Sequence, residues 1–339
     1  MAATRFDPRP ELWDTERRVE LEAVVLGEGT LARLARAGGG DPVSVRAGLL
    51  EATAERGALP AGTSAVVVGV LQAAGPAAPT DPPVGTRVAV AAPADVLPLW
   101  LAETARWSGL APVVPARGHA VLGPHVPLVR LEGETPSTAA CLVPWLGLLD
   151  GRWGPPSTPT ATAAVLGADH VAGLLAVDAL VAAGWSVHAT VADLPAARIV
   201  QAAGAVPVVV GASDPAALET EVTASLARAH AGTAELVVVA PPSREDAGAP
   251  VGEVGDVGGA LAAGALAAPD GRVVVLRPAD APPAVASLDA RGCPAQVVAQ
   301  RTAPTRPTTL GDVASRTLEV ARWHAGDGPR PSSARPEDV

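Results

Sequence analysis

The sequence contains no Lys, Asn or Tyr, and it has only two Cys, one Met and one Phe. Because Lys and Tyr are absent, a Tyr–Lys catalytic pair, a lysine Schiff base and a lysine phosphate anchor are excluded. The two cysteines, Cys141 and Cys293, lie far apart without a CxxC motif or a Cys/His cluster, so we predict no structural zinc site. All 25 basic residues are Arg, which we interpret as a coding bias toward GC-rich codons.

Charge and hydropathy narrow the class of protein further. The net charge is −10 and no basic cluster is present, which argues against a nucleic-acid partner. Mean hydropathy is +0.28, but the apolar stretch 172–192 is interrupted by Asp178, Gly184 and His188, so no membrane span is predicted. Residues 1–20 lack the apolar core of a signal peptide. We therefore expect a soluble, acidic, cytoplasmic protein.

Strand-like and helix-like segments alternate from Thr162 onward. The predicted strands are short, Val-rich and apolar throughout, which is typical of a parallel sheet covered on both faces. The predicted helices begin at capping or proline residues and end near glycines. The strands are expected at 162–168, 186–192, 206–211, 235–240 and 272–276, and the helices at 171–184, 194–204, 214–232 (capped by Asp214) and 257–271.

The residues before this unit have a different pattern. Short strands broken by Gly and Pro are expected at 19–29, 63–76, 83–93 and 125–131, which indicates an antiparallel β domain, with one helix over 41–57. After the α/β unit we expect a strand at 295–303 and a helix within 308–325. Residues 326–339 are polar and rich in Pro and Gly, which predicts a disordered tail.

The order of these elements, with segments 66–90 and 258–276, resembles the medium-chain dehydrogenases/reductases. The resemblance covers Val19 to Ala325 and implies an α/β protein with a GroES-like β domain and a Rossmann domain, a doubly wound parallel sheet that binds NAD(P). It places the GroES-like catalytic domain at 1–145 and 285–325 and the Rossmann domain at 146–284. Segment 39–57 is similar to a helix of the L-erythro-3,5-diaminohexanoate dehydrogenases, which are zinc-independent members of that family.

The dinucleotide turn is expected directly after the strand at 162–168. Its residues are Gly167, Ala168, Asp169, His170, Val171 and Gly173, in which Gly167 suits the tight turn and Gly173 suits close packing of helix on strand. Asp169 stands where backbone should approach the pyrophosphate, and two unit charges about 4 Å apart repel by about 4 kcal/mol at an effective dielectric constant near 20. His170 offsets this repulsion only in part. Alternatively, Asp169 turns outward and caps the following helix.

A second candidate site for the cofactor lies at the end of the next strand. NAD-binding folds place an acidic residue about 20 positions after the glycine turn to hold the ribose hydroxyls, and Asp193 has this spacing from Gly173. Arg198 follows within the helix, and the pattern favours NAD over NADP. The alternative is that Asp193 only caps the helix that begins near Pro195.

The catalytic residues are not identified by the sequence. The resemblance implies no catalytic zinc, because segment 21–35 has no Cys where the first ligand belongs, and no metal site is expected. Four residues are unranked candidates for proton transfer, and three others either bind a substrate carboxylate or are ordinary surface charges. The first group is Thr63, Ser64, His119 and His125, and the second is Glu55, Arg56 and Arg277.

Two functions stay open at this point. The first is a zinc-independent, NAD(H)-dependent oxidoreductase that transfers hydride to or from a small amino- or keto-acid-like substrate. The second is a non-catalytic protein of the same fold that acts as a binding or partner subunit, which Asp169 and the short loop after Gly57 both favour. The resemblance also implies a possible homodimer, for which segment 295–300 is the expected edge strand.

Overall fold

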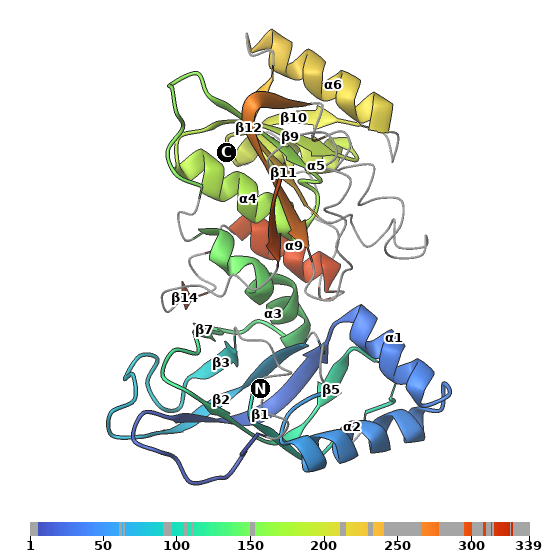
Figure 1. Cartoon of the computed structure of the whole chain (residues 1–339), viewed down its shortest axis with the longest axis vertical. Helices are drawn as coiled ribbons and strands as arrows, with labels where there is room; N and C mark the ends of the chain where they lie inside the picture. The colour runs from blue at the N-terminus through green and yellow to red at the C-terminus, as the bar shows by residue number, and fades with distance from the viewer. Residues whose placement is uncertain are drawn as a thin grey trace. The chain divides into compact units, whose positions relative to one another are not determined.

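The computed structural model consists of two compact units, and each is described by itself (Figure 1). The first unit comprises Met1–Pro144 and Ala303–Val313, and the second comprises Trp145–Thr302 and Ala314–Val339. The structure describes residues 6–60, 63, 65–90, 97–104, 107–109, 111–149, 153–210, 215–229, 233–240, 263, 266–277, 295–299, 308–309, 313, 315–325 and 327.

The first unit is built on a mainly antiparallel sheet, as the sequence predicts. Along the sheet the strands follow the order β14-β7-β3-β2-β1-β6-β4, and β5 also pairs with β1. Among the strand pairs that the structure describes in this sheet, β14–β7 alone is parallel. The strands are β1 (Arg17–Leu26), β2 (Ala65–Ala74), β3 (Arg87–Val90), β4 (Leu99–Glu103), β5 (Val113–Pro115), β6 (Arg117–Leu122), β7 (Leu128–Arg130) and β14 (Thr308–Thr309).

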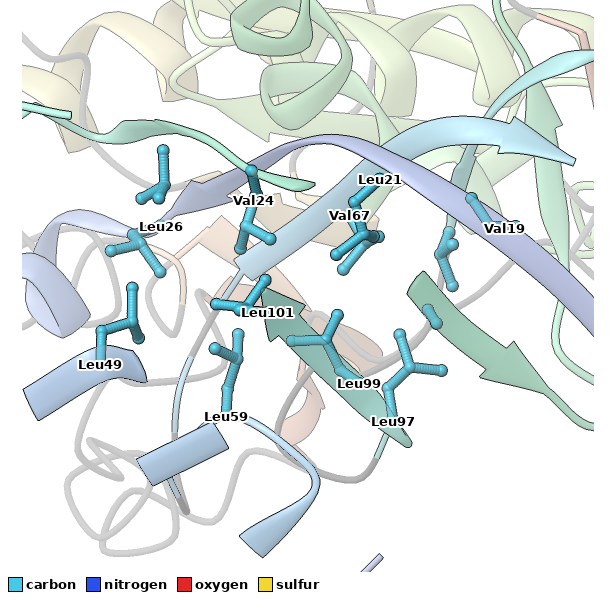
Figure 2. Packing of buried hydrophobic residues seen from close by; sticks show 14 of the residues in the cluster. Val19, Leu21, Val24, Leu26, Leu49, Leu59, Val67, Leu97, Leu99 and Leu101 are labelled. Atoms are coloured by element: carbon cyan, nitrogen blue, oxygen red, sulfur yellow. The ribbon is translucent and has the colours of Figure 1, made fainter. Parts of the chain in front are cut away.

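The core of this unit is almost entirely aliphatic, with Trp107 as an aromatic member, in keeping with the scarcity of aromatic residues. Side chains of β1, β2 and β4 point toward one another and toward Leu49 of helix α2, as Figure 2 shows. Leu49, Leu59 and Leu99 are completely buried. Burying a Leu or Val side chain stabilises the fold by about 1.5–3 kcal/mol, so each residue of this cluster contributes to the stability of the unit.

Helix α2 (Pro42–Arg56) confirms the helix predicted over 41–57. Asp41 caps its N-terminus by accepting hydrogen bonds from the backbone N–H groups of Val43 and Ser44, and Gly57 ends it with a φ of 69°. Helix α1 (Glu28–Ala37) is not among the predicted elements, and its first two residues fall within the strand expected over 19–29. That part of the prediction is wrong, since β1 ends at Leu26 and the chain turns at Gly27.

The second unit contains a parallel six-stranded sheet, which confirms the predicted α/β class. Its strands follow the order β10-β9-β8-β11-β12-β13. The strands are β8 (Thr162–Leu166), β9 (Ser186–Val191), β10 (Val206–Val209), β11 (Ala234–Val239), β12 (Ala267–Arg277) and β13 (Ala295–Ala299). The helices are α4 (Val171–Ala182), α5 (Leu194–Ala202), α6 (Pro215–Arg228) and α9 (Ser315–His324). Helix α3 (Pro136–Leu142) belongs to the first unit, where it contacts β1 and β2, and the 3-10 helix η2 (Val143–Leu149) follows it in sequence.

Several boundaries differ from the prediction. The helix expected over 257–271 is strand from Ala267 onward, because β12 extends along β11 as far as the pair Ala234–Ala267. Helix α9 packs on α4, and β13 pairs with β12, so both elements belong to the second unit, whereas 285–325 had been assigned to the first. Asp214 and nearly all of the predicted tail 326–339 lie outside the described residues.

Candidate functional site

The predicted turn lies at the carboxyl end of β8, next to the point where the strand order reverses. Numbered in chain order within their own sheet, the strands run 3-2-1-4-5-6, and β8 and β11 are strands 1 and 4 of this order. In open parallel sheets, ligands bind beyond the carboxyl ends of the strands at such a reversal. The turn that begins at Gly167 is therefore at the position where this fold binds ligands.

Gly167 adopts a backbone conformation that other residues rarely reach, with a φ of 84°. Its N–H donates to Oγ1 of Thr190 at 2.9 Å, and the N–H of Ala168 donates to the Thr190 carbonyl at 2.8 Å. Thr190 is buried in β9. Two hydrogen bonds to one residue therefore fix the turn to the neighbouring strand, a role of Thr190 that the spacing of glycines does not reveal.

Gly173 allows helix α4 to pack directly against the turn. A Cβ atom at this position would lie 2.2 Å from the carbonyl oxygen of Gly167 and 2.8 Å from Cα of Ala168. Both are backbone atoms, which cannot move aside as a flexible side chain does. The last glycine of a dinucleotide turn allows the helix to approach the strand closely. Gly173 meets this requirement, because a side chain would not fit at its position.

His170, rather than Asp169, is the N-cap residue of α4. Its Nδ1 atom accepts a hydrogen bond from the N–H of Ala172 at 3.1 Å, and its own N–H donates to the Gly167 carbonyl at 3.2 Å. The imidazole ring also meets the ring of Trp145 edge to face, with centroids 6.2 Å apart. The alternative in which Asp169 caps the helix is therefore wrong by one residue, because the cap is the next residue, His170. Asp169 itself is half-buried in the turn.

The remaining residues of the turn contribute backbone only. The side chains of Ala168 and Val171 are buried in the core of the second unit. Their apolar character anchors the turn to the sheet, and their peptide groups stay at the N-terminus of α4, where the helix dipole favours negative charge. Glycines at these positions and a helix N-terminus are the features with which dinucleotide-binding folds hold a pyrophosphate.

Asp193 lies two residues beyond the end of β9 and is the N-cap residue of α5. Its Oδ1 atom accepts a hydrogen bond from the N–H of Ala196 at 2.9 Å. The capping role considered from the sequence is therefore present. Arg198 lies on the same helix and is exposed to solvent. Because β8 and β9 are parallel neighbours, the Gly167 turn and Asp193 share the same edge of the sheet.

A buried polar pair in the second unit was not anticipated. Nδ1 of His188 on β9 lies 2.8 Å from Oγ of Ser225 on α6, and Nε2 is buried without a hydrogen-bond partner in the described part of the chain. Burial lowers the pKa of His188 below its ordinary value, and the positive charge of Arg228 lowers it further. The sequence carried no signal for this pair because Ser225 lies 37 residues away.

The candidates for proton transfer and substrate binding lie mainly in the first unit. Thr63 is buried and accepts a hydrogen bond from Arg33, the ring of His119 contacts the Pro8 carbonyl, and His125 is exposed. Glu55 is exposed on α2, and the guanidinium of Arg56 lies 5.7 Å from the centre of the Phe6 ring. Ser64 and the side chain of Arg277 lie outside the described residues.

Neither a metal-binding cluster nor a membrane-spanning helix is found in the part of the chain that the structure describes. Within the ranges that the structure describes, no three His, Cys, Asp or Glu side chains gather as a metal site requires. Across those same ranges, no helix has the length and apolarity needed to cross a bilayer.

Comparison with known proteins places these observations in context. Residues 1–132 match the sequence profile described as L-erythro-3,5-diaminohexanoate dehydrogenase N-terminal domain. No curated protein matches the chain. Among solved structures, a crotonyl-CoA carboxylase/reductase in complex with NADP is similar with a TM-score of 0.51 and 14% identity, over 95% of this chain and 87% of that one.

Two other similar structures have lower TM-scores. A mycobacterial protein complexed with NADPH gives a TM-score of 0.46 at 16% identity, over 96% of this chain and 85% of that one. A short chain alcohol dehydrogenase from E. coli, complexed with NADH, gives 0.45 at 15% identity, over 94% of this chain and 82% of that one.

The fold is that of the medium-chain dehydrogenases/reductases, with a GroES-like sheet followed by a Rossmann sheet. Within this fold, the first 132 residues are similar to the L-erythro-3,5-diaminohexanoate dehydrogenase N-terminal domain. The resemblance inferred from the order of the elements and from segments 39–57 and 66–90 is thereby confirmed, and the low identity to solved structures marks the chain as diverged.

Proposed function

We propose that the chain is an NAD(H)-dependent oxidoreductase that transfers hydride to or from a small amino- or keto-acid-like substrate. The observation that carries the proposal is the close contact of Gly173 with the Gly167 turn at the reversal of the strand order. Position 173 has no room for a Cβ atom, as the last glycine of a dinucleotide turn requires. The family of residues 1–132 supports the dehydrogenase class and the amino-acid-like substrate.

The residues of the second unit divide the binding task. The backbone from Gly167 to Ala172 would hold the pyrophosphate at the N-terminus of α4, and Asp193 would accept hydrogen bonds from the ribose hydroxyls. The bound nicotinamide supplies or accepts the hydride. Asp169 adds negative charge beside the pyrophosphate, so we expect weak binding and a strong gain in affinity for Asp169→Gly, up to about a thousandfold.

The preference for NAD over NADP rests on Asp193. A carboxylate at the end of β9 repels the 2′-phosphate of NADP and suits the free hydroxyls of NAD. Asp193→Asn is a matched test, because Asn caps a helix as well as Asp does but carries no charge. The variant should keep its thermal stability and bind NADPH about tenfold more tightly or better. An unchanged ratio of NADPH to NADH affinity would remove Asp193 from the cofactor site.

Hydride transfer without zinc is the remaining part of the proposal. A catalytic zinc needs three protein ligands of the Cys, His or carboxylate type, and the chain has only Cys141 and Cys293 as thiol donors. Cys141 lies on α3, and no metal-binding group of residues surrounds it in the described ranges. We propose that protons are transferred by side chains or water rather than by a metal-bound group.

The proposed activity is tested by turnover. The purified chain is mixed with NADH, ammonium and a panel of small keto acids, or with NAD and the matching amino acids, and the nicotinamide absorbance is followed over time. Turnover that persists after treatment with a zinc chelator and depends on NAD(H) rather than NADP(H) is expected. Turnover with no member of the panel, by a protein that binds NADH, would contradict the substrate class.

A non-catalytic function is the second candidate, because the N-terminus of α4 is already capped from within by His170. In that case the chain would serve as a binding or partner subunit, and β13, at one end of the parallel sheet, would be the surface for a second copy. Absence of cofactor binding together with a stable dimer in sedimentation experiments would support this function over the first.

A further inference from the structure

We propose that His170 sets the cofactor affinity of this turn by competing with phosphate for the N–H of Ala172. The inference rests on the proposed function, because it assumes that the dinucleotide binds at the α4 N-terminus. It concerns a residue of the turn that the motif treats as variable, and it predicts that a change at this residue tightens binding rather than weakening it.

The competition follows from the hydrogen bonds of the helix end. The first N–H groups of a helix have no partner within the helix, and they are the donors that a phosphate uses when it binds there. Ala172 is the second residue of α4, and its N–H is directed at Nδ1 of His170 at 3.1 Å. A backbone N–H makes one strong hydrogen bond, so the ring and a phosphate oxygen cannot both accept it.

The ring is held in this position from a second side. Trp145, which is buried, meets the His170 ring at an interplanar angle of 87° and a centroid distance of 6.2 Å. Edge-to-face contacts of this kind are favourable beyond the area that they bury. A dinucleotide that takes the Ala172 N–H must therefore displace the ring from both the amide and the indole.

The size of the effect follows from the strength of a helix cap. A side-chain cap changes helix stability by an amount that corresponds to roughly a tenfold change in an equilibrium constant. His170→Gly removes the competing acceptor, and Gly is tolerated at N-cap positions, so the variant folds. We expect its Kd for ADP-ribose, which carries the pyrophosphate without the nicotinamide, to be about tenfold lower than that of the unaltered chain.

His170→Asn is the matched control. Asn is smaller than His and cannot pack on Trp145 in the same way, but its side-chain oxygen still accepts a hydrogen bond from the helix N-terminus. If competition for the amide sets the affinity, the Asn variant stays close to the unaltered chain and only the Gly variant gains. Equal gains in both variants would mean that the bulk of the ring matters instead, which would overturn the proposal.

Adenosine serves as the control ligand. It has no phosphate, so it does not need the Ala172 N–H, and its affinity should be the same in all three proteins. A parallel gain for adenosine and ADP-ribose would contradict the proposal, because it would show a general change of the pocket rather than a change at the pyrophosphate.

An NMR titration gives a readout that does not depend on affinity. On addition of ADP-ribose to the unaltered chain, the ring nitrogen signals of His170 and the amide signal of Ala172 should shift together, and a Trp145→Phe variant should identify the accompanying change in tryptophan fluorescence. Saturation with ADP-ribose that leaves the His170 and Ala172 signals in place would overturn the proposal.

The outcomes separate this inference from the proposed function. Binding of ADP-ribose and NADH by the unaltered chain, with no gain in His170→Gly, leaves the function standing and overturns the competition. Binding that appears only in His170→Gly supports the competition and shows that the unaltered turn is closed. No binding by any folded variant, verified by thermal unfolding, overturns both.

Discussion

Gly173→Ala should damage the second unit and its binding site, although alanine is the better helix former. The added Cβ would lie 2.2 Å from the Gly167 carbonyl oxygen, well inside the closest contacts that real side chains make. Helix α4 would have to move away from the turn, or the turn would have to leave its hydrogen bonds to Thr190. Either shift also disturbs the helix end at which the pyrophosphate is proposed to bind.

The expected loss of stability is set by two opposing terms. Forcing an extra carbon into a packed region costs about 1–3 kcal/mol, and the higher helix propensity of Ala returns up to about 1 kcal/mol. The unfolding free energy of the second unit should therefore fall by about 1–2 kcal/mol. The affinity for ADP-ribose should fall as well, since the turn and helix no longer meet.

Gly48→Ala provides the matched control for this prediction. Gly48 lies in the interior of α2, is exposed, and has no atom within 4 Å of the position that a Cβ would occupy. Alanine should there stabilise the chain by about 0.5–1 kcal/mol. Urea unfolding followed by circular dichroism measures both variants. A Gly173→Ala protein as stable as the unaltered chain would refute the reasoning about close packing.

Two other predictions concern the same sheet. Thr190→Val should cost about 1–3 kcal/mol, because it removes the hydroxyl that pairs with the Gly167 N–H, whereas Thr190→Ser should cost much less; equal losses in urea unfolding would contradict this. The pKa of His188 is lowered in the folded chain, so the unfolded chain binds a proton first as pH falls. Above about pH 6.5 His188 is neutral in both states, so it does not make the unfolding free energy depend on pH. Below that pH the unfolding free energy should drop by at most about 1.4 kcal/mol per pH unit. His188→Asn should flatten this slope in urea unfolding at several pH values, and an unchanged slope would show that other groups cause it.

The backbone of the turn could be predicted from the sequence because its two glycines meet local steric requirements. Gly167 needs a positive φ and Gly173 needs the absence of a Cβ, and both demands are visible as spacing after a buried strand. The cap was displaced by one residue because Asp169 and His170 are adjacent and both can accept hydrogen bonds. His170 gains the contact with Trp145, which a local pattern does not reveal.

The sequence predicted the order of most elements correctly, but it did not predict helix α1, the start of β12 or the unit to which α9 belongs. Helix α1 was missed because glycines on both sides of it hid the change from a period of two to a helical period. The extension of β12 to Ala267 arises from pairing with β11, which overrides the helix preference of an Ala-rich segment. Likewise, α9 joins the second unit through its packing on α4, a contact that depends on distant residues such as Thr317 and Asp178.

The most direct test of the central claim is titration of the unaltered chain with NADH and with NADPH. Nicotinamide fluorescence measures the affinity, and thermal unfolding at saturating cofactor provides an independent check, because a ligand that binds the folded state raises the unfolding temperature. Measurable NADH binding, with weaker NADPH binding and a rise in unfolding temperature, is the predicted result. Absence of binding and of stabilisation by either cofactor at millimolar concentration would contradict the account.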